Sequence, residues 1–532
     1  MSRRKGVSKR VLSAVLSAAM VATTIPAMSI TASAESAEGN IELSRQVAAD
    51  GMVLLENRDE ALPVQQGTTV AMFGRAMIDY TRGGGGSGAT NVDYTRNILQ
   101  GMQIKEEEGK ISLYQPLVDF YTEQVTTNGI KNDAQIDVTD EMMDAAAAAA
   151  DTAVVTIGRY SSEGSDRSAT KGDYYLSDAE EELITRVAAK FDKVIVVLNV
   201  GAVTDTSWIN AIEGVDAVLV GWQAGMEGGL ATADVLVGDV NPSGRLVDTW
   251  AKSYEDYPSA ETFNESTGYV NYTEDIYVGY RYFETFDPDY EKVNYPFGYG
   301  LSYTDFEISD VTVDFDGDAL TGTANVSATV TNTGDMAGKE VVQVYFSAPQ
   351  AGEGEAKMSK PAKELAAFDK TDLLEPGESE TLNMSFAISD MSSYDDIGET
   401  GHKSAYVMEA GDYDIYVGDS IKNAGEQGVR GTYNVAETTV TEQLTEKLAP
   451  TQLPERLMAD GKYHEIEVAP GFDPHHTIAA EGQTVVQSEA MIGGDVTVEG
   501  FYDDNFERLS CIAMMNAVGK YAEYEITVEE AG

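Results

Sequence analysis

The residues best suited to chemistry lie in one short polar segment that follows an apolar run. Glu163 stands between small residues, and Asp166 and Arg167 follow it three and four positions later. A carboxylate that takes up and releases a proton is a candidate general acid or base, and a charged pair beside it would support it electrostatically. The segment also has a plainer interpretation. Glu163 could be a solvated loop carboxylate, and Asp166 with Arg167 could be an ion pair that only holds the loop.

The stretches around this segment predict how the chain positions it. Apolar runs alternate with stretches in which apolar residues recur at helical spacing, and Ser177 or Asp178 could cap one predicted helix. This alternation predicts a mainly parallel sheet covered by helices on both faces, with the chemistry at the carboxyl ends of the strands. The predicted strands are residues 69–73, 153–157, 194–198 and 217–220, and the predicted helices are residues 47–55, 140–150, 178–190 and 230–237.

Two further features lie between these predicted elements. Glu227 directly precedes a predicted helix, where a carboxylate would suit the helix dipole, so a structural role competes with a role at the site. Residues 83–88 are almost all glycine but lack the Lys and Ser or Thr that end a phosphate-binding loop. We therefore interpret them as a tight loop that lets two backbones approach closely at a domain contact.

The composition excludes several classes of partner. The chain has 532 residues and a formal net charge of −53, which argues against nucleic acid and against anionic membrane surfaces. Cys511 is the only cysteine, so the chain has no internal disulfide framework and no cysteine-based metal site. Three of the four histidines, His464, His475 and His476, fall in a predicted linker or tail. We expect neither a cofactor nor a metal ion.

The first 34 residues predict a signal peptide. Basic residues at positions 3–5, 9 and 10 precede a mostly apolar stretch, and Ala32-Ser33-Ala34 fits the pattern of a cleavage site. An uncleaved membrane anchor is the alternative, but the apolar stretch is short and contains Pro26. We therefore expect a secreted protein that does not associate with the membrane after cleavage.

The pattern changes from about residue 301 to alternating segments separated by turn signals. The alternation over residues 324–331, 340–346 and 380–386 predicts a small antiparallel β-sandwich that ends near Gly418. Residues 419–474 are polar and irregular, which predicts a linker. Residues 475–532 alternate again but are too few for an ordinary sandwich, so we predict a partial one in a chain that is cut short. The predicted fold class is α/β plus all-β.

Six motifs occur in an order that resembles the non-barrel half of family 3 glycoside hydrolases, the β-glucosidase-like enzymes. One such motif alone would be weak evidence, whereas six in the same order are specific. They are Val53-Leu-Leu-Glu-Asn57 followed by Leu62-Pro63, Glu163-Gly-x-Asp166-Arg167, Gly225-Met-Glu227-Gly-Gly229, Gly238-Asp-Val-Asn-Pro-Ser-Gly244-Arg245-Leu246, Tyr277-x-Gly-Tyr280-Arg-Tyr282 and Tyr295-Pro-Phe-Gly-Tyr-Gly300-Leu-Ser-Tyr303.

The resemblance implies an order of domains. Residues 41–265 would form a six-stranded α/β sandwich, residues 266–304 a connecting segment and residues 305–418 a fibronectin type III-like domain. The tail, residues 475–532, resembles the start of a family 6 carbohydrate-binding module. The α/β part follows the signal peptide almost directly, as in permuted members of the family that carry a (β/α)-barrel last. The barrel and its nucleophile motif are absent from this sequence.

The resemblance also implies an activity, the hydrolysis of terminal β-linked glucose or xylose with retention. A retaining glycosidase uses two carboxyl groups about 5 Å apart, one as nucleophile and one as acid/base. Glu163 matches the position of the acid/base, while Asp166, Arg167 and Glu227 would support the substrate loop. Tyr160 could stack on a sugar ring, although a packed or solvated tyrosine is more common. The expected partner is an oligosaccharide.

The missing nucleophile leaves other hypotheses open. The chain could be a truncated or carbohydrate-binding protein without catalytic activity, in which Glu163 is idle. It could also be completed by a barrel domain that lies downstream or is supplied in trans.

Overall fold

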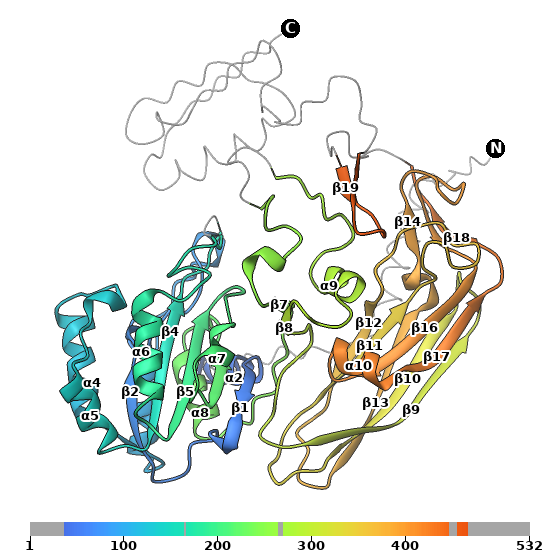
Figure 1. Cartoon of the computed structure of the whole chain (residues 1–532). Helices are drawn as coiled ribbons and strands as arrows, with labels where there is room; N and C mark the ends of the chain where they lie inside the picture. Colours follow the sequence, from blue (N-terminus) through green and yellow to red (C-terminus); the bar gives the residue numbers. More distant parts are fainter. Residues whose placement is uncertain (1–36, 164–165, 264–269, 446–454, 466–532) are drawn as a thin grey trace, which may run out of the picture.

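The computed structural model describes residues 37–163, 166–263, 270–445 and 455–465. Figure 1 shows an α/β domain and a β-sandwich, with a connecting segment between them. The predicted signal peptide, residues 1–34, and the predicted tail module, residues 475–532, lie outside the described residues.

The α/β domain is built on one six-stranded sheet, the number that the family resemblance implies. Its strands are β1 (Val53–Asn57), β2 (Thr69–Phe73), β3 (Ser112–Leu113), β4 (Thr152–Arg159), β5 (Lys193–Val200) and β6 (Ala217–Val220). They lie in the order β1-β6-β5-β4-β2-β3, and only β1 is antiparallel to its neighbour. The parallel strands therefore all end at the same edge of the sheet.

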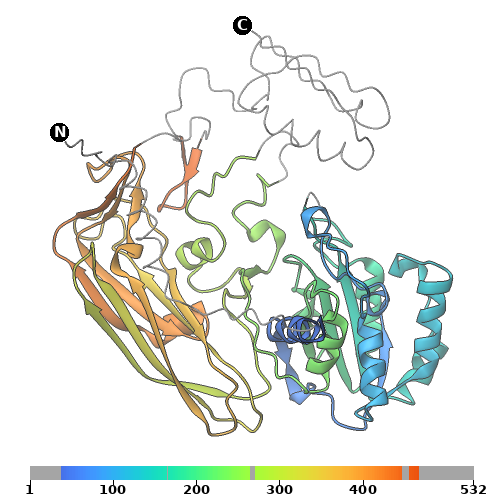
Figure 2. The same ribbon diagram turned by 180° about the vertical axis from the view of Figure 1, so that it is seen from behind.

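Helices cover both faces of this sheet, as predicted. They are α2 (Ala37–Asp50), α3 (Ile98–Glu107), α4 (Gln115–Thr122), α5 (Asp140–Ala147), α6 (Asp178–Ala188), α7 (Trp208–Ala211) and α8 (Gly228–Leu236). α2 and α3 pack on α8 on one face, and α6 lies across β4 and β5 on the other (Figure 1 and Figure 2). Ser177 caps α6, as predicted, in a reciprocal capping box with Glu180.

The predicted helix over residues 47–55 is wrong in its second half. α2 ends at Asp50, and β1 begins at Val53 after a turn at Gly51. Val53, Leu54 and Leu55 are fully buried, so the strand lacks the alternation that would distinguish it from a buried helix. The segment is a strand because it pairs with β6, and its own residues do not indicate that pairing.

The second unit is an antiparallel β-sandwich, as predicted. One sheet has the order β13-β10-β9 and the other the order β12-β11-β16-β17, with an apolar core between them. These strands are β9 (Phe306–Asp316), β10 (Thr323–Asn332), β11 (Val341–Ser347), β12 (Glu364–Lys370), β13 (Ser379–Ala387), β16 (Gly411–Gly418) and β17 (Val429–Val435). A small extra sheet contains β14 (Ser393–Asp395), β15 (Ala405–Met408) and β18 (Thr439–Gln443).

The predicted linker from residue 419 begins too early. The chain continues from Gly418 into α10 (Ile421–Gln427) and then into β17, which pairs with β16 as the edge strand of the larger sheet. Polar residues alternate with Val429, Gly431, Tyr433 and Val435 along β17, so a strand signal was present in the sequence and the linker prediction missed it. The sandwich therefore extends well beyond Gly418.

Short elements between and after the two units complete the described chain. β7 (Trp250–Ala251) pairs with β8 (Val293–Tyr295), and α9 (Tyr280–Phe286) lies between them in the sequence. Beyond the sandwich, β19 (Glu455–Leu457) pairs with β20 (Tyr463–Glu465).

Polar contacts join the α/β domain to the sandwich. Arg245 pairs with the buried Glu340. The Asp50 carboxylate lies 2.9 Å from Lys339 Nζ, and the Asp50 carbonyl accepts a hydrogen bond of 3.2 Å from Lys370 Nζ. Burial lowers the pKa of Lys370 to about 8, because its ammonium group loses hydration in this interface.

This lowered pKa predicts that stability rises with pH over a defined window. An unfolded lysine keeps its proton up to about pH 10, so between about pH 8 and pH 10 the unfolded chain binds a proton that the folded chain has released. The free energy of unfolding should therefore increase with pH there. Urea unfolding at both ends of the window measures this increase in the free energy of unfolding. The Lys370→Met variant should lack the part that Lys370 contributes. An equal rise in the variant would contradict the assignment.

Candidate active site at the carboxyl edge of the sheet

The loops beyond the parallel strands bring most of the sequence-predicted residues to one edge of the sheet. The loop after β4 carries Glu163, Asp166 and Arg167, the loop after β2 carries the glycine-rich segment, and the turn after β6 leads to Glu227. The loops after β2 and β4 lie side by side at the top of the α/β domain in Figure 1. This edge is where open α/β sheets bind ligands.

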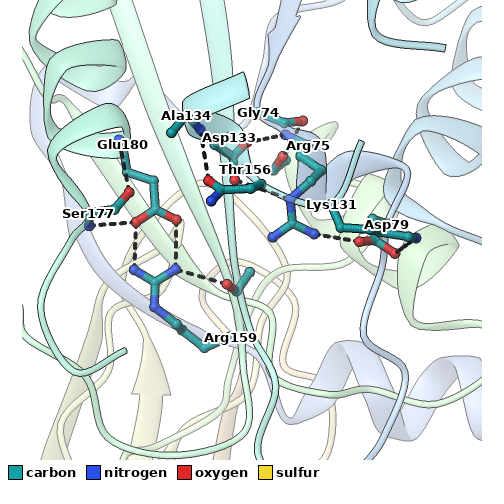
Figure 3. Close-up of polar contacts among 12 residues, drawn as sticks. Gly74, Arg75, Asp79, Lys131, Asp133, Ala134, Thr156, Arg159, Ser177 and Glu180 are labelled. Carbon is teal, nitrogen blue, oxygen red and sulfur yellow. Dashed lines mark hydrogen bonds and ion pairs between the residues drawn. The ribbon is translucent and has the colours of Figure 1, made fainter. Parts of the chain in front are cut away.

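Arg159, the last residue of β4, fixes the base of the Glu163 loop. Its Nη1 and Nη2 donate to the two carboxylate oxygens of Glu180 on α6, at 2.7 and 2.6 Å (Figure 3). Its Nε donates to the carbonyl of Asp173 at 2.8 Å, and Nη2 also donates to the carbonyl of Tyr175 at 3.3 Å. Arg159 and Glu180 are both buried. One side chain thus joins the strand, the returning loop and the first turn of α6.

Arg167 closes the same loop, although not with the predicted partner. Its Nη1 lies 2.5 Å from a carboxylate oxygen of Asp173, and its Nη2 donates to the hydroxyl of Ser161 at 3.0 Å and to the carbonyl of Tyr160. Asp166, which the sequence pattern suggested as the partner, is exposed. Neighbours in an extended segment point apart, whereas the returning chain brings Asp173 opposite Arg167.

The glycine-rich loop lies directly against the Glu163 loop. The Gly85 amide donates to the Ser162 hydroxyl at 2.5 Å. A side chain at Gly84 would meet the backbone of Ser162, and one at Gly86 would overlap the Glu163 carboxylate, which is itself exposed. Gly86 also has φ of +60°, which glycine adopts without strain. The predicted close approach is found, but it joins two loops of one domain.

Asn199 ties the loops after β2 and β6 to β5, and sequence reasoning missed it. Its Nδ2 donates to the carbonyls of Thr81 and Trp222, at 2.9 and 2.7 Å, and its Oδ1 accepts from the Thr81 amide at 2.8 Å. The residue is 1% exposed. A single amide side chain within the otherwise apolar run 194–200 was the available signal, since a buried amide must find hydrogen-bond partners.

Glu227 supports the loop after β2 instead of capping α8. Its side chain makes no capping bond to the helix, although the residue occupies the N-terminal position. It is 1% exposed, accepts a hydrogen bond from the Tyr94 hydroxyl and lies 3.5 Å from Arg96 Nε. The carboxylate therefore binds side chains of the neighbouring loop, where the sequence suggested an interaction with the helix dipole.

Tyr160 directly follows β4 and is 51% exposed, so one face of the loop carries an accessible aromatic ring. Within the described ranges, no group of three His, Cys, Asp or Glu side chains is arranged to hold a metal ion. The same part of the chain contains no helix long and apolar enough to cross a bilayer.

Comparison with protein families identifies both units. Residues 52–303 match the glycosyl hydrolase family 3 C-terminal domain, and residues 340–421 match a fibronectin type III-like domain. The chain belongs to glycosyl hydrolase family 3. Its sequence is 43% identical to beta-glucosidase A of Butyrivibrio fibrisolvens over 481 residues, and 38% identical to a beta-glucosidase of Ruminococcus albus over 439 residues.

Solved structures of this family superpose on the same part of the chain. A β-glucosidase from Paenibacillus barengoltzii, 44% identical, matches 81% of the chain with a TM-score of 0.72. β-Glucosidase 3B from Thermotoga neapolitana in complex with α-D-glucose, 38% identical, matches 76% with a TM-score of 0.66. The chain spans about half the length of these family 3 proteins: the matches cover 56% and 44% of the two curated relatives and 48% and 55% of the two structures.

Breaking the Arg159–Glu180 pair is predicted to destabilise the α/β domain. Arg159→Met leaves a buried carboxylate without its counter-charge, which typically costs about 3–5 kcal/mol. Arg159→Met/Glu180→Leu should recover part of this loss, because apolar side chains can replace a buried ion pair. Urea unfolding measures each variant.

The exposed pair Lys190–Asp144 serves as the control, since Lys190→Met should change stability by less than about 1 kcal/mol. Arg159→Met with wild-type stability would show that the Glu163 loop does not depend on this pair.

Proposed function

We propose that the chain supplies the acid/base half of a family 3 β-glycosidase, with Glu163 as the acid/base. The observation that carries the proposal is the position of Glu163, an exposed carboxylate at the carboxyl edge of the sheet. Its loop is packed against Gly86 and held by Arg159 and Arg167. A general acid must be held within hydrogen-bond reach of its proton acceptor, and these contacts restrict where the carboxylate can be.

In this proposal the substrate is a short oligosaccharide with a terminal β-linked glucose or xylose. Glu163 donates a proton to the glycosidic oxygen while a second carboxylate attacks C1 and displaces that oxygen. It then removes a proton from the water that attacks the glycosyl intermediate. Each step inverts C1, so the product keeps the configuration of the substrate. The curated relatives named as β-glucosidases favour glucose as the sugar.

The other predicted residues have supporting roles. Arg167 holds the Glu163 loop through Asp173, and Glu227 holds the loop after β2 through Tyr94. Tyr160 offers an accessible ring on which a sugar could stack. Asp166 is exposed in the same loop and is the candidate for a polar contact to the substrate.

The nucleophile has to come from another carboxylate about 5 Å from the acid/base. The matched regions cover 56% and 44% of two curated relatives, so we propose that a barrel domain provides it, within the same protein or in trans. Without a barrel, the chain would act as a non-catalytic carbohydrate-binding protein.

We also propose secretion, on the basis of the basic and apolar stretches in residues 1–34. Mass spectrometry of the protein released by the producing cells should find Glu35 at its N-terminus. Retention of Met1 in cell-bound protein would contradict this part of the proposal.

The acid/base role predicts a specific loss of turnover. A chimera can be made in which residues 41–445 replace the matching region of the Butyrivibrio fibrisolvens relative. The relative then supplies the rest of a family 3 protein. In this chimera, Glu163→Gln should lower kcat for p-nitrophenyl β-glucoside by about 10²–10⁴-fold, because Glu163 also activates the water that hydrolyses the glycosyl intermediate. Hydrolysis by the isolated chain, assayed alongside, should be undetectable.

Asp166→Asn is the matched control, because it removes an exposed carboxylate from the same loop. It should retain kcat within about tenfold, because losing a contact made equally in the ground state and the transition state raises KM and leaves kcat unchanged. Full turnover by the Glu163→Gln chimera would rule out the proposed role. Turnover by the isolated chain would mean that it carries its own nucleophile.

A further inference from the structure

A cavity lies where the α/β domain meets the β-sandwich, and none of its lining residues belongs to the Glu163 loop. It has a volume of about 560 Å³, within the range common for small-molecule sites. The α/β domain lines it with residues after β5 and β6 and with residues 243–248, while the sandwich contributes residues of β11 and β12. Ligand sites occur preferentially at such interfaces between domains.

Two buried polar atoms in this wall have no hydrogen-bond partner within the described part of the chain. They are the hydroxyl of Ser243, a residue 1% exposed, and Nε of Arg245, whose side chain is 9% exposed. An unpaired buried donor or acceptor costs about 1–3 kcal/mol. Asp248 also lines the cavity; its side chain is exposed, and its carboxylate has no protein partner among the described residues. A ligand with both donors and acceptors would pair the two buried atoms and replace the water at the Asp248 carboxylate.

Aromatic side chains supply the apolar part of the wall. Trp222 is held in place before any ligand binds, since its indole N–H donates to the Gly51 carbonyl at 2.9 Å and its ring meets Trp250 edge-on at 6.2 Å. Its φ of +51° is rare for a large side chain, and such strain concentrates at ligand sites. Phe368 on β12 is 65% exposed although it lines the cavity.

The charges around the cavity are largely paired with one another. Arg245 pairs with Glu340, and Lys339 pairs with Asp50. Asp248 keeps a carboxylate without a counter-charge among the described residues, so the cavity disfavours an anionic ligand. The remaining groups are a hydroxyl, one N–H and a carboxylate beside aromatic rings. This combination fits the alternating hydroxyl groups and apolar ring face of a sugar.

We propose that this interdomain cavity binds a neutral mono- or disaccharide, through ring contact with Trp222 and Phe368 and hydrogen bonds to Ser243, Arg245 and Asp248. The choice of glucose and cellobiose as probes rests on the proposed function, whereas the position of the site does not. The cavity is a second carbohydrate site beside the one at Glu163.

Titration of the full chain with glucose and cellobiose, followed by calorimetry and by tryptophan fluorescence, tests the site. Saturable binding is expected. Phe368→Ala should weaken it about fivefold, because one aromatic contact is worth about 0.5–1.5 kcal/mol. Ser243→Ala should weaken it by a similar factor, and Trp222→Phe should remove the fluorescence change. Both Phe368→Ala and Ser243→Ala lose no described hydrogen bond, so the fold should be retained.

Two control variants separate this site from others. Tyr394→Ala removes a different exposed aromatic ring of the sandwich and should leave the affinity unchanged. Glu163→Gln should also leave it unchanged. No saturable binding, or equal affinity in Phe368→Ala, Ser243→Ala and wild type, would overturn the proposal. Binding lost only in Glu163→Gln would place the sugar at the Glu163 loop, which refutes the cavity site but supports the proposed function.

Discussion

The buried ion pair between Arg159 and Glu180 is the interaction on which the candidate site depends. Charges removed from water are tolerated only when each has its counter-charge and its remaining hydrogen-bond groups are filled. The guanidinium meets this condition only when β4, α6 and the carbonyls of Asp173 and Tyr175 are all in place. The strand, the helix and the loop that carries Glu163 therefore form as one unit.

Neighbouring loops are added to this unit by contacts that leave no room for larger side chains. The glycine-rich loop approaches the Glu163 loop so closely that Gly86 faces the carboxylate itself. Asn199 connects the same loop to Trp222 through its amide group. Trp222 in turn lines the cavity at the sandwich. The two proposed sugar sites thus share one hydrogen-bonded framework, although they lie on different loops.

The sequence pattern predicted those elements of the fold whose formation depends on neighbouring residues. The buried runs that became β4 and β5, and the capping box of Ser177 with Glu180, could be predicted because burial and capping are visible in neighbouring residues. β1 could not, since its fully buried run lacks alternation and its partner β6 is distant in the sequence, and β17 was missed although its partner β16 is close. At the site, Glu163 was singled out by its position after an apolar run and by a family motif, and its role stays a prediction. The ion-pair partner of Arg167 and the role of Asn199 depend on where the chain folds back on itself. The sequence analysis therefore missed both.

The dependence of the rate on the leaving group tests the central claim, that Glu163 protonates the glycosidic oxygen, most directly. Aryl β-glucosides of increasing leaving-group pKa can be compared in the chimeric enzyme with and without Glu163→Gln. A poor leaving group needs the proton and a good one does not. The loss of kcat/KM, which reports the step that breaks the glycosidic bond, should therefore grow steadily as the leaving group becomes more basic. A loss of equal size for every leaving group would contradict the claim and assign Glu163 a purely structural role.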